Sequence, residues 1–291
     1  MRRVLGALIT AAALALAGCA SSAPSAQWHA ADGGVASAAA SGQGGGAPVA
    51  HPIGENPSSA SSPKPSASAS ASPSSSASAS ASASSSPPPP ADGIMRQTGT
   101  AAVALTFDDG PGPETPRLLA MLREQGIKAT FCVIGVNVQE YPQYVQDIVR
   151  DGHTLCNHTW KHDTSLGKKS ADTIRADLQR TNDEIHKAVP DVPIKYFRHP
   201  GGNFTPTAVR VASELGMVSV GWTVDPFDWN LQKWKGQQMT NHIIATVRNN
   251  TKPGAIILSH DGGGDRSATI AAYKTLLPEL KAKFTLEALP L

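Results

Sequence analysis

The chain has 291 residues and a formal net charge of +2, with 25 lysines and arginines against 23 aspartates and glutamates. This balance excludes a strongly basic nucleic-acid-binding protein and provides no attraction to an anionic membrane surface. Ser, Ala, Pro and Gly fill 58 of the 70 positions from 21 to 90. This segment therefore has too few large apolar side chains to form a core. The roughly 200 residues that follow are enough for one domain.

The N-terminus has the pattern of an export signal. Arg2 and Arg3 precede an apolar run over 4–17, which at about 14 residues is too short to span a bilayer. The run ends in LAGC at 16–19, which resembles the bacterial lipoprotein signal. That resemblance implies cleavage before Cys19 and a lipid on its thiol. We therefore expect an extracytoplasmic protein, lipid-anchored to the bacterial cell membrane and facing the cell wall; the alternative is an ordinary secretory signal with an incidental cysteine.

These features divide the chain into three parts: a lipoprotein signal peptide at 1–18, a disordered Ser/Ala/Pro-rich tether at 19–91, and a folded domain at 92–291. As a flexible coil, the tether averages roughly 50 Å from end to end, and full extension approaches about 200 Å. That reach suits a protein that is anchored to a membrane and works in a cell wall.

Strand-like apolar runs alternate with helical periodicity throughout the folded domain. Strands are expected near 103–107, 130–134, 154–157, 195–197, 218–221, 255–259 and 284–286. Helices are expected near 115–125, 141–150, 206–215, 239–249 and 269–281, with a further long helix that Ser170 caps. This alternation predicts an α/β fold with a parallel sheet, in which functional side chains gather at the C-terminal ends of the strands.

Polar clusters follow five of the predicted strands. They are TFDDG at 106–110, HTWKH at 158–162, RHPGG at 198–202, DPFDW at 225–229 and LSH at 258–260. Each cluster alone is also explained by a turn, a helix cap or a buried ring. His158 and His162 are four residues apart, which on a helix places both on one face where they can share a metal. Two histidines and one carboxylate leave coordination positions open for water, as catalytic sites do.

Taken together, the five clusters resemble the motifs of the polysaccharide deacetylase family of metal-dependent carbohydrate esterases, over about residues 100–290. The resemblance implies a distorted (β/α) barrel, which we expect to have seven strands, and removal of acetyl groups from sugars. It implies that Asp109, His158 and His162 hold a divalent metal. Zinc is expected, and cobalt or manganese remains open because this ligand set is not selective by itself.

The resemblance and the chemistry of amide hydrolysis also assign acid–base roles. Asp108 is expected to be the general base, kept ionised and oriented by Arg198, because a nearby positive charge lowers the pKa of a carboxylate. His260 is expected to be the general acid that protonates the leaving amine. Asp225 is expected to orient His260, with Asp228 as the weaker candidate.

The remaining assigned positions concern the substrate. The backbone N–H of Gly201 is expected to hold the oxyanion, and Trp229 and Leu258 are expected to wall a pocket for the acetyl methyl group. Other family members usually have an aromatic residue where Gly201 stands. Cys132 and Cys156 lie on neighbouring predicted strands, and the sequence leaves open whether they form a disulfide or remain two free thiols.

The expected function is removal of N-acetyl groups from N-acetylglucosamine units of a cell-wall or chitin-type polysaccharide. Two alternatives remain: an O-acetyl esterase acting on a xylan-type polysaccharide, and a non-catalytic wall-binding module. The expected partners are an acetylated polysaccharide or oligosaccharide and, through Cys19, the membrane. We expect no nucleic-acid partner and a monomeric protein.

Overall fold

The structure, a computed structural model, describes residues 90–291. The predicted signal peptide, Cys19 and nearly all of the predicted tether lie outside these described residues, so those assignments stay predictions. Within the described range, no helix is both long enough and apolar enough to cross a membrane.

Seven parallel strands form one curved sheet in the order β1-β6-β5-β4-β3-β2-β7. They are β1 (Ile94–Met95), β2 (Ala104–Gly110), β3 (Thr130–Val133), β4 (Thr154–Asn157), β5 (Tyr196–Phe197), β6 (Val218–Val220) and β7 (Ile256–His260). Isolated bridges join Gln97 to Ala255 and Val224 to Ile257, which brings the β1–β6 side of the sheet against β7. The predicted seven-stranded, distorted (β/α) barrel is therefore confirmed.

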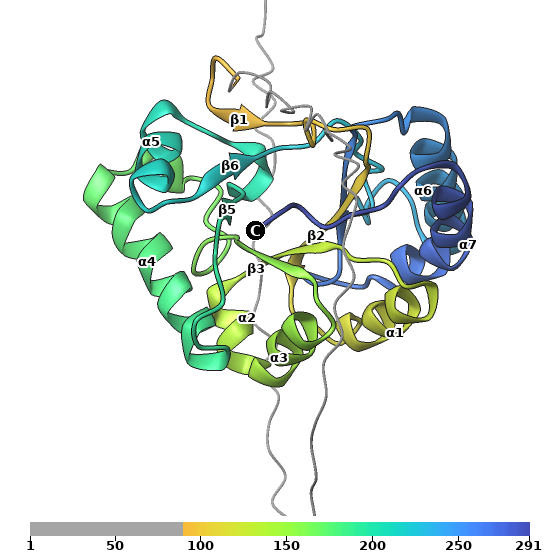
Figure 1. The fold of residues 1–291 in the computed structure, drawn as a ribbon, viewed down its shortest axis with the longest axis horizontal. Coiled ribbons are helices and arrows are strands. Elements are labelled where there is room, and N and C mark those ends of the chain that lie inside the picture. The colour runs from red at the N-terminus through yellow and green to blue at the C-terminus, as the bar shows by residue number, and fades with distance from the viewer. Residues whose placement is uncertain (1–89) are drawn as a thin grey trace, which may run out of the picture. The chain divides into compact units, whose positions relative to one another are not determined.

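Helices lie around the outside of this ring of strands (Figure 1). They are α1 (Thr115–Gln125), α2 (Gly135–Glu140), α3 (Pro142–Arg150), α4 (Ala171–Ala188), α5 (Pro206–Glu214), α6 (Gly236–Asn250) and α7 (Ser267–Lys283). Ser170 caps α4 as predicted, because its side chain accepts a hydrogen bond from the backbone N–H of Thr173. The left-handed residue Gly126, with φ of 64°, ends α1.

One predicted strand is wrong. Residues 284–286 form only an isolated bridge, between Leu286 and Val103, while the unpredicted β1 pairs with β6 as the seventh strand. The physical reason is that the chain after α7 leaves the sheet and enters the barrel. There Leu289 is buried, its N–H donates to Thr130 Oγ1 (2.9 Å) and its carbonyl accepts from Thr154 Oγ1 (2.8 Å). Figure 1 shows the C-terminus inside the ring of strands.

Alternation along β2 divides its side chains between the two faces of the sheet. Leu105 and Phe107 are fully buried on the outer face, where Phe107 packs edge-on against Tyr273 of α7 at 5.1 Å between ring centroids. Asp108 belongs to the opposite, inner face. The apolar core between sheet and helices therefore fixes the strand whose inner face carries the polar cluster.

The inner face carries a row of side chains in register across four strands. Asp108 of β2 pairs with His260 of β7 on one side and with Cys132 of β3 on the other, and Cys132 pairs with Cys156 of β4. Cys132 and Cys156 form a disulfide, and their Cα atoms are 4.1 Å apart. The two cysteines are separated by 24 residues in the sequence. A loop of that length corresponds to about 3 kcal/mol of stabilisation in the chain-entropy account. The covalent link thus lies in the same row as Asp108 and His260.

Candidate active site

Asp109, His158 and His162 form a compact group of metal-ligand type. Their ligand atoms all lie within 4.8 Å of one another. Asp109 Oδ1 is 3.4 Å from His158 Nε2 and 3.2 Å from His162 Nε2. This buried carboxylate oxygen has no hydrogen-bond partner among the described residues. A buried, unsatisfied carboxylate facing two imidazole nitrogens is costly by itself and matches the donor set of a divalent metal.

The tautomer of His158 also suits a metal ligand. His158 Nδ1 lies 2.8 Å from the backbone carbonyl of Arg198, so the proton belongs on Nδ1 and the lone pair of Nε2 faces Asp109. Burial raises the pKa of the Asp109 carboxyl, but the surrounding imidazoles of His158, His260 and His162 outweigh burial and lower it. Asp109 is therefore ionised, as a metal ligand must be.

A bulge in β2 allows two adjacent aspartates to serve one site. Asp108 is in register with Cys132, whereas Gly110 is in register with Val133, so Asp109 is an extra residue on β2. Asp109 has a φ of 68°, in the left-handed region, and its carbonyl accepts from the side chain of Asn137 at 2.8 Å. Bulges re-aim side chains in this way. The prediction that both carboxylates reach one site is confirmed.

The predicted helical placement of His158 and His162 is wrong. Both lie in the irregular loop after β4, and His162 and Thr159 have positive φ values of 57° and 70°. The side chain of Asn157 shapes this loop by accepting from the N–H of Thr159 at 2.9 Å, and Asp177 accepts from the N–H of Trp160 at 2.8 Å. Left-handed turns therefore bring the two imidazoles together where a helix was expected.

Asp108 is held by a fully buried arginine. Arg198 Nη1 donates to Asp108 Oδ1 at 2.7 Å and to Thr106 Oγ1 at 2.8 Å. The other guanidinium nitrogens donate to the carbonyls of Val220 and Gly221, each at 3.1 Å. Asp108 Oδ2 lies 3.7 Å from His158 Nε2, so the second oxygen of Asp108 faces the metal-ligand group. The predicted pairing of Arg198 with Asp108 is confirmed.

The partner of His260 is Asp228, and the predicted order of the two aspartates is wrong. Asp228 Oδ1 lies 2.7 Å from His260 Nδ1, and Asp228 Oδ2 accepts from the backbone N–H of His260 at 2.9 Å. Thr269 Oγ1 donates to the same Oδ2 at 2.8 Å. Burial lowers the pKa of His260, but the Asp228 carboxylate outweighs burial and raises that pKa to about 9. The raised pKa favours the protonated form of His260 at neutral pH.

Asp225 has a different contact. Its Oδ1 accepts a hydrogen bond from the backbone N–H of Phe227 at 2.7 Å. This bond spans two residues and closes a local turn. Burial raises the pKa of Asp225. The turn is the physical reason for the correction, because it commits Asp225 to its own loop and leaves Asp228 to reach β7.

Sequence reasoning missed Arg266, which lies in the loop after β7 and is fully buried. Its Nε donates to the carbonyl of Gly262 at 2.6 Å, and its Nη1 donates to the carbonyl of Asp228 at 3.0 Å. Its Nη2 lies 3.9 Å from Asp109 Oδ2. Arg266 thus contacts both the metal-ligand group and the residue that holds His260. No motif marks it, since its role depends on the path of the loop.

Asp261 is a fourth buried carboxylate beside the site, after Asp108, Asp109 and Asp228, and the sequence did not predict it. Its N–H donates to the carbonyl of Asp108 at 3.1 Å, and its Oδ2 accepts from Thr115 Oγ1. Burial, followed by the charges of Asp109 and Asp108, raises the pKa of Asp261 to about 7. Asp261 therefore links the end of β2 to the start of α1 beside the site.

The three predicted substrate positions differ in exposure. Gly201 lies in a short 3₁₀ turn with φ of 62°, a conformation that suits glycine better than the aromatic residue usual in the family. Leu258 is buried on β7, whereas Trp229 is 45% exposed. Leu258 can therefore line an enclosed space, while Trp229 stands at the surface beside Asp228.

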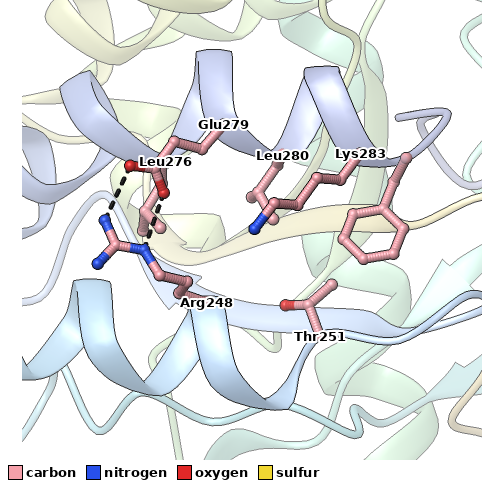
Figure 2. Close-up of a pocket in the computed structure, with 7 residues that line it drawn as sticks. Arg248, Thr251, Leu276, Glu279, Leu280 and Lys283 are labelled. Atoms are coloured by element: carbon pink, nitrogen blue, oxygen red, sulfur yellow. Dashed lines mark hydrogen bonds and ion pairs between the residues drawn. The ribbon is translucent and has the colours of Figure 1, made fainter.

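A cavity of about 200 Å³ lies elsewhere, between the C-terminal ends of α6 and α7. Its lining includes Arg248, whose guanidinium forms two hydrogen bonds with Glu279 at 3.0 and 2.8 Å (Figure 2). None of the predicted site residues lines this cavity. The cavity is therefore separate from the group formed by Asp109, His158 and His162.

This fold is a parallel (β/α) barrel that carries an Asp-His-His group of metal-ligand type beside the buried residues Asp108 and His260. The polysaccharide deacetylase family profile matches residues 95–220. A Bacillus cereus protein named peptidoglycan-N-acetylglucosamine deacetylase is 37% identical over 182 residues, which is 62% of this chain and 81% of that protein. A Sinorhizobium fredii chitooligosaccharide deacetylase is 34% identical over 205 residues, 66% of this chain and 92% of that one. The chain belongs to the polysaccharide deacetylase family, and the predicted enzyme class is confirmed.

Solved structures agree on the fold. A peptidoglycan N-acetylglucosamine deacetylase bound to a hydroxamate-type benzamide is similar with a TM-score of 0.61 and 32% identity, covering 68% of this chain and 90% of that chain. A carbohydrate esterase family 4 pseudoenzyme from Bacillus anthracis is similar with a TM-score of 0.59 and 29% identity, covering 67% of this chain and 66% of that chain. The family fold therefore carries both an enzyme and a pseudoenzyme among the chain's structural relatives.

The assignment of Asp228 to His260 yields a test. Asp228→Asn removes the charge that raises the pKa of His260, so His260 should lose its proton at a lower pH. We expect turnover at pH 8 to fall at least about 10²-fold and the alkaline limb of the rate profile to move to lower pH. The matched control, Asp225→Asn, keeps an oxygen for the Phe227 N–H and should cost less than about tenfold. An unchanged alkaline limb in Asp228→Asn, or a larger loss in Asp225→Asn, contradicts the assignment.

Proposed function

We propose that the protein is a metal-dependent deacetylase that removes N-acetyl groups from N-acetylglucosamine units of peptidoglycan or a chitin-type glycan. The observation that carries this proposal is the separation of roles between adjacent aspartates. Asp109 faces two histidines, while Asp108 is held by Arg198 and lies in register with His260. The names of the relatives support the substrate class.

Asp109, His158 and His162 would hold a divalent metal, which when bound would supply Lewis-acid polarisation of the acetyl carbonyl and lower the pKa of a water molecule. Asp108 accepts the proton of the attacking water at Oδ2, because Oδ1 is occupied by Arg198. The backbone N–H of Gly201 stabilises the developing oxyanion. His260 then donates its proton to the leaving nitrogen, and Asp228 holds the ring in place through Nδ1. The products are acetate and a free amine on the sugar.

The state of His260 favours an amide substrate over an ester. Amide and ester hydrolysis pass through the same type of tetrahedral intermediate, so O-acetylated xylan remains the second candidate. An amine is a poorer leaving group than an alcohol and requires protonation, which the raised pKa of His260 provides. The third candidate, a non-catalytic wall-binding module, is disfavoured because the chain retains Asp108, His260 and all three candidate metal ligands. The metal we propose is zinc, with cobalt and manganese as alternatives.

Acetate release tests the proposed function directly. Incubation with N-acetylchitopentaose, peptidoglycan and acetylated xylan should release acetate fastest from one of the first two. A chelator should abolish release, and added Zn²⁺ or Co²⁺ should restore it. Asp108→Asn should lose turnover at least about 10²-fold. Release mainly from xylan supports the esterase instead, and full activity in a metal-free preparation overturns the metal assignment.

We also propose that a lipid on Cys19 anchors the protein to the outer face of the cell membrane as a monomer, with the segment to residue 91 as its tether. The support is the LAGC sequence at 16–19 and the cell-wall substrates named for the relatives. The mature protein should partition into detergent, and Cys19→Ser should release it or leave it unprocessed. A mature protein that is unlipidated and cut elsewhere contradicts the anchor.

A further inference from the structure

The loop between β6 and α6 exposes two large aromatic side chains next to the catalytic residues. Phe227 is 42% exposed and Trp229 is 45% exposed. Their ring centroids are 5.7 Å apart, with 54° between the ring planes. Within residues 90–291, they are the aromatic members of a small set of strongly exposed large apolar residues: Val136, Val218, Phe227, Trp229 and Leu291. The two rings adjoin each other at the surface, and contiguous exposed apolar groups, unlike singly scattered ones, point to a binding surface.

The backbone at Phe227 is held in an unfavourable conformation. Its φ is 53°, in the left-handed region that bulky residues rarely adopt. The Asp225 carboxylate fixes this turn by accepting from the Phe227 N–H at 2.7 Å. Strain of this kind persists where the surrounding structure enforces it, and it gathers at ligand-binding sites. Here the turn directs a large apolar ring to the solvent.

The position of the pair identifies its occupant. Between the two aromatic residues lies Asp228, which is buried and hydrogen-bonded to His260. Successive Cα atoms are about 3.8 Å apart, so Phe227 and Trp229 lie at the edge of the catalytic centre. A molecule that rests on them while the centre turns over is an extended part of the substrate. The apolar faces of pyranose rings suit contact with aromatic rings.

We propose that Phe227, together with Trp229, forms a stacking surface for a sugar ring of the glycan next to the residue that is deacetylated. This inference rests on the proposed function and deepens it. Phe227 acts in it as a specificity-determining residue that favours an oligomeric glycan over a small acetylated compound. Asp225 acts as a positioning residue, because it holds the turn that presents Phe227.

Substitutions at Phe227 distinguish the contribution of its aromatic ring from that of the turn that presents it. Phe227→Asn removes the ring but keeps the turn, since asparagine tolerates the left-handed region. Phe227→Tyr keeps a ring of the same shape. Val218→Ala, which shortens an exposed apolar residue at the start of β6, is the matched control. KM and kcat are measured with N-acetylchitopentaose, and turnover of 4-nitrophenyl acetate, an ester without a sugar, is measured alongside.

We expect Phe227→Asn to raise KM for the pentasaccharide about tenfold with kcat changed less than about twofold. Its preference for the pentasaccharide over the sugar-free ester should fall by the same factor. Phe227→Tyr and Val218→Ala should match the wild type. An unchanged KM in Phe227→Asn, or equal losses in Phe227→Asn and Phe227→Tyr, overturns the stacking surface.

Binding of the pentasaccharide by calorimetry separates this inference from the proposed function. If the wild type releases no acetate, the proposed function fails, and calorimetry still reports on the surface. In that case a pentasaccharide Kd about tenfold weaker in Phe227→Asn supports stacking, and equal Kd values, or absence of binding to the wild type, overturn it.

Discussion

The buried contact between Arg198 and Asp108 is the constraint on which the site depends. Arg198 is fully buried, and an unpaired buried charge costs several kcal/mol, so its guanidinium must find partners for every donor. The partners come from β2 and from the end of β6, which lie on opposite sides of the barrel. Satisfying Arg198 therefore draws the two sides together and fixes one oxygen of Asp108. The other oxygen faces His158 of the metal-ligand group.

The bulge at Asp109 converts that fixed strand end into a site with two functions. In a regular strand, Asp108 and Asp109 would point to opposite faces of the sheet. The extra residue and its positive φ turn Asp109 toward the two histidines, while Asp108 keeps its register with His260 and Cys132. The disulfide to Cys156 continues the same row into β4, the strand that leads to His158. Covalent and hydrogen-bonded links thus fix Asp108 and His260 relative to Asp109 and the two histidines.

The sequence predicted the site residues well where they are polar residues that directly follow an apolar strand. Short apolar runs located six of the seven strands, and the polar clusters after them contain the residues that meet in the site. The sequence was uninformative where left-handed backbone turns determine which way a side chain points. The loop of His158 and His162 was predicted as a helix because spacing alone cannot show a positive φ. The choice between Asp225 and Asp228 failed for the same reason, since the turn at Phe227 decides which carboxylate reaches His260. Arg266 was invisible because its partners are backbone carbonyls brought near by the fold.

The central claim is that Asp109 binds the metal and Asp108 does not. The most direct measurement is the zinc affinity of the metal-free protein, determined by competition with a chelating dye for the wild type, Asp109→Asn and Asp108→Asn. Both substitutions remove one carboxylate charge from adjacent positions, so each controls for the other. The account predicts that Asp109→Asn weakens zinc binding at least about 100-fold, while Asp108→Asn stays within about tenfold of the wild type. Equal weakening in the two variants, or a larger loss in Asp108→Asn, would contradict it.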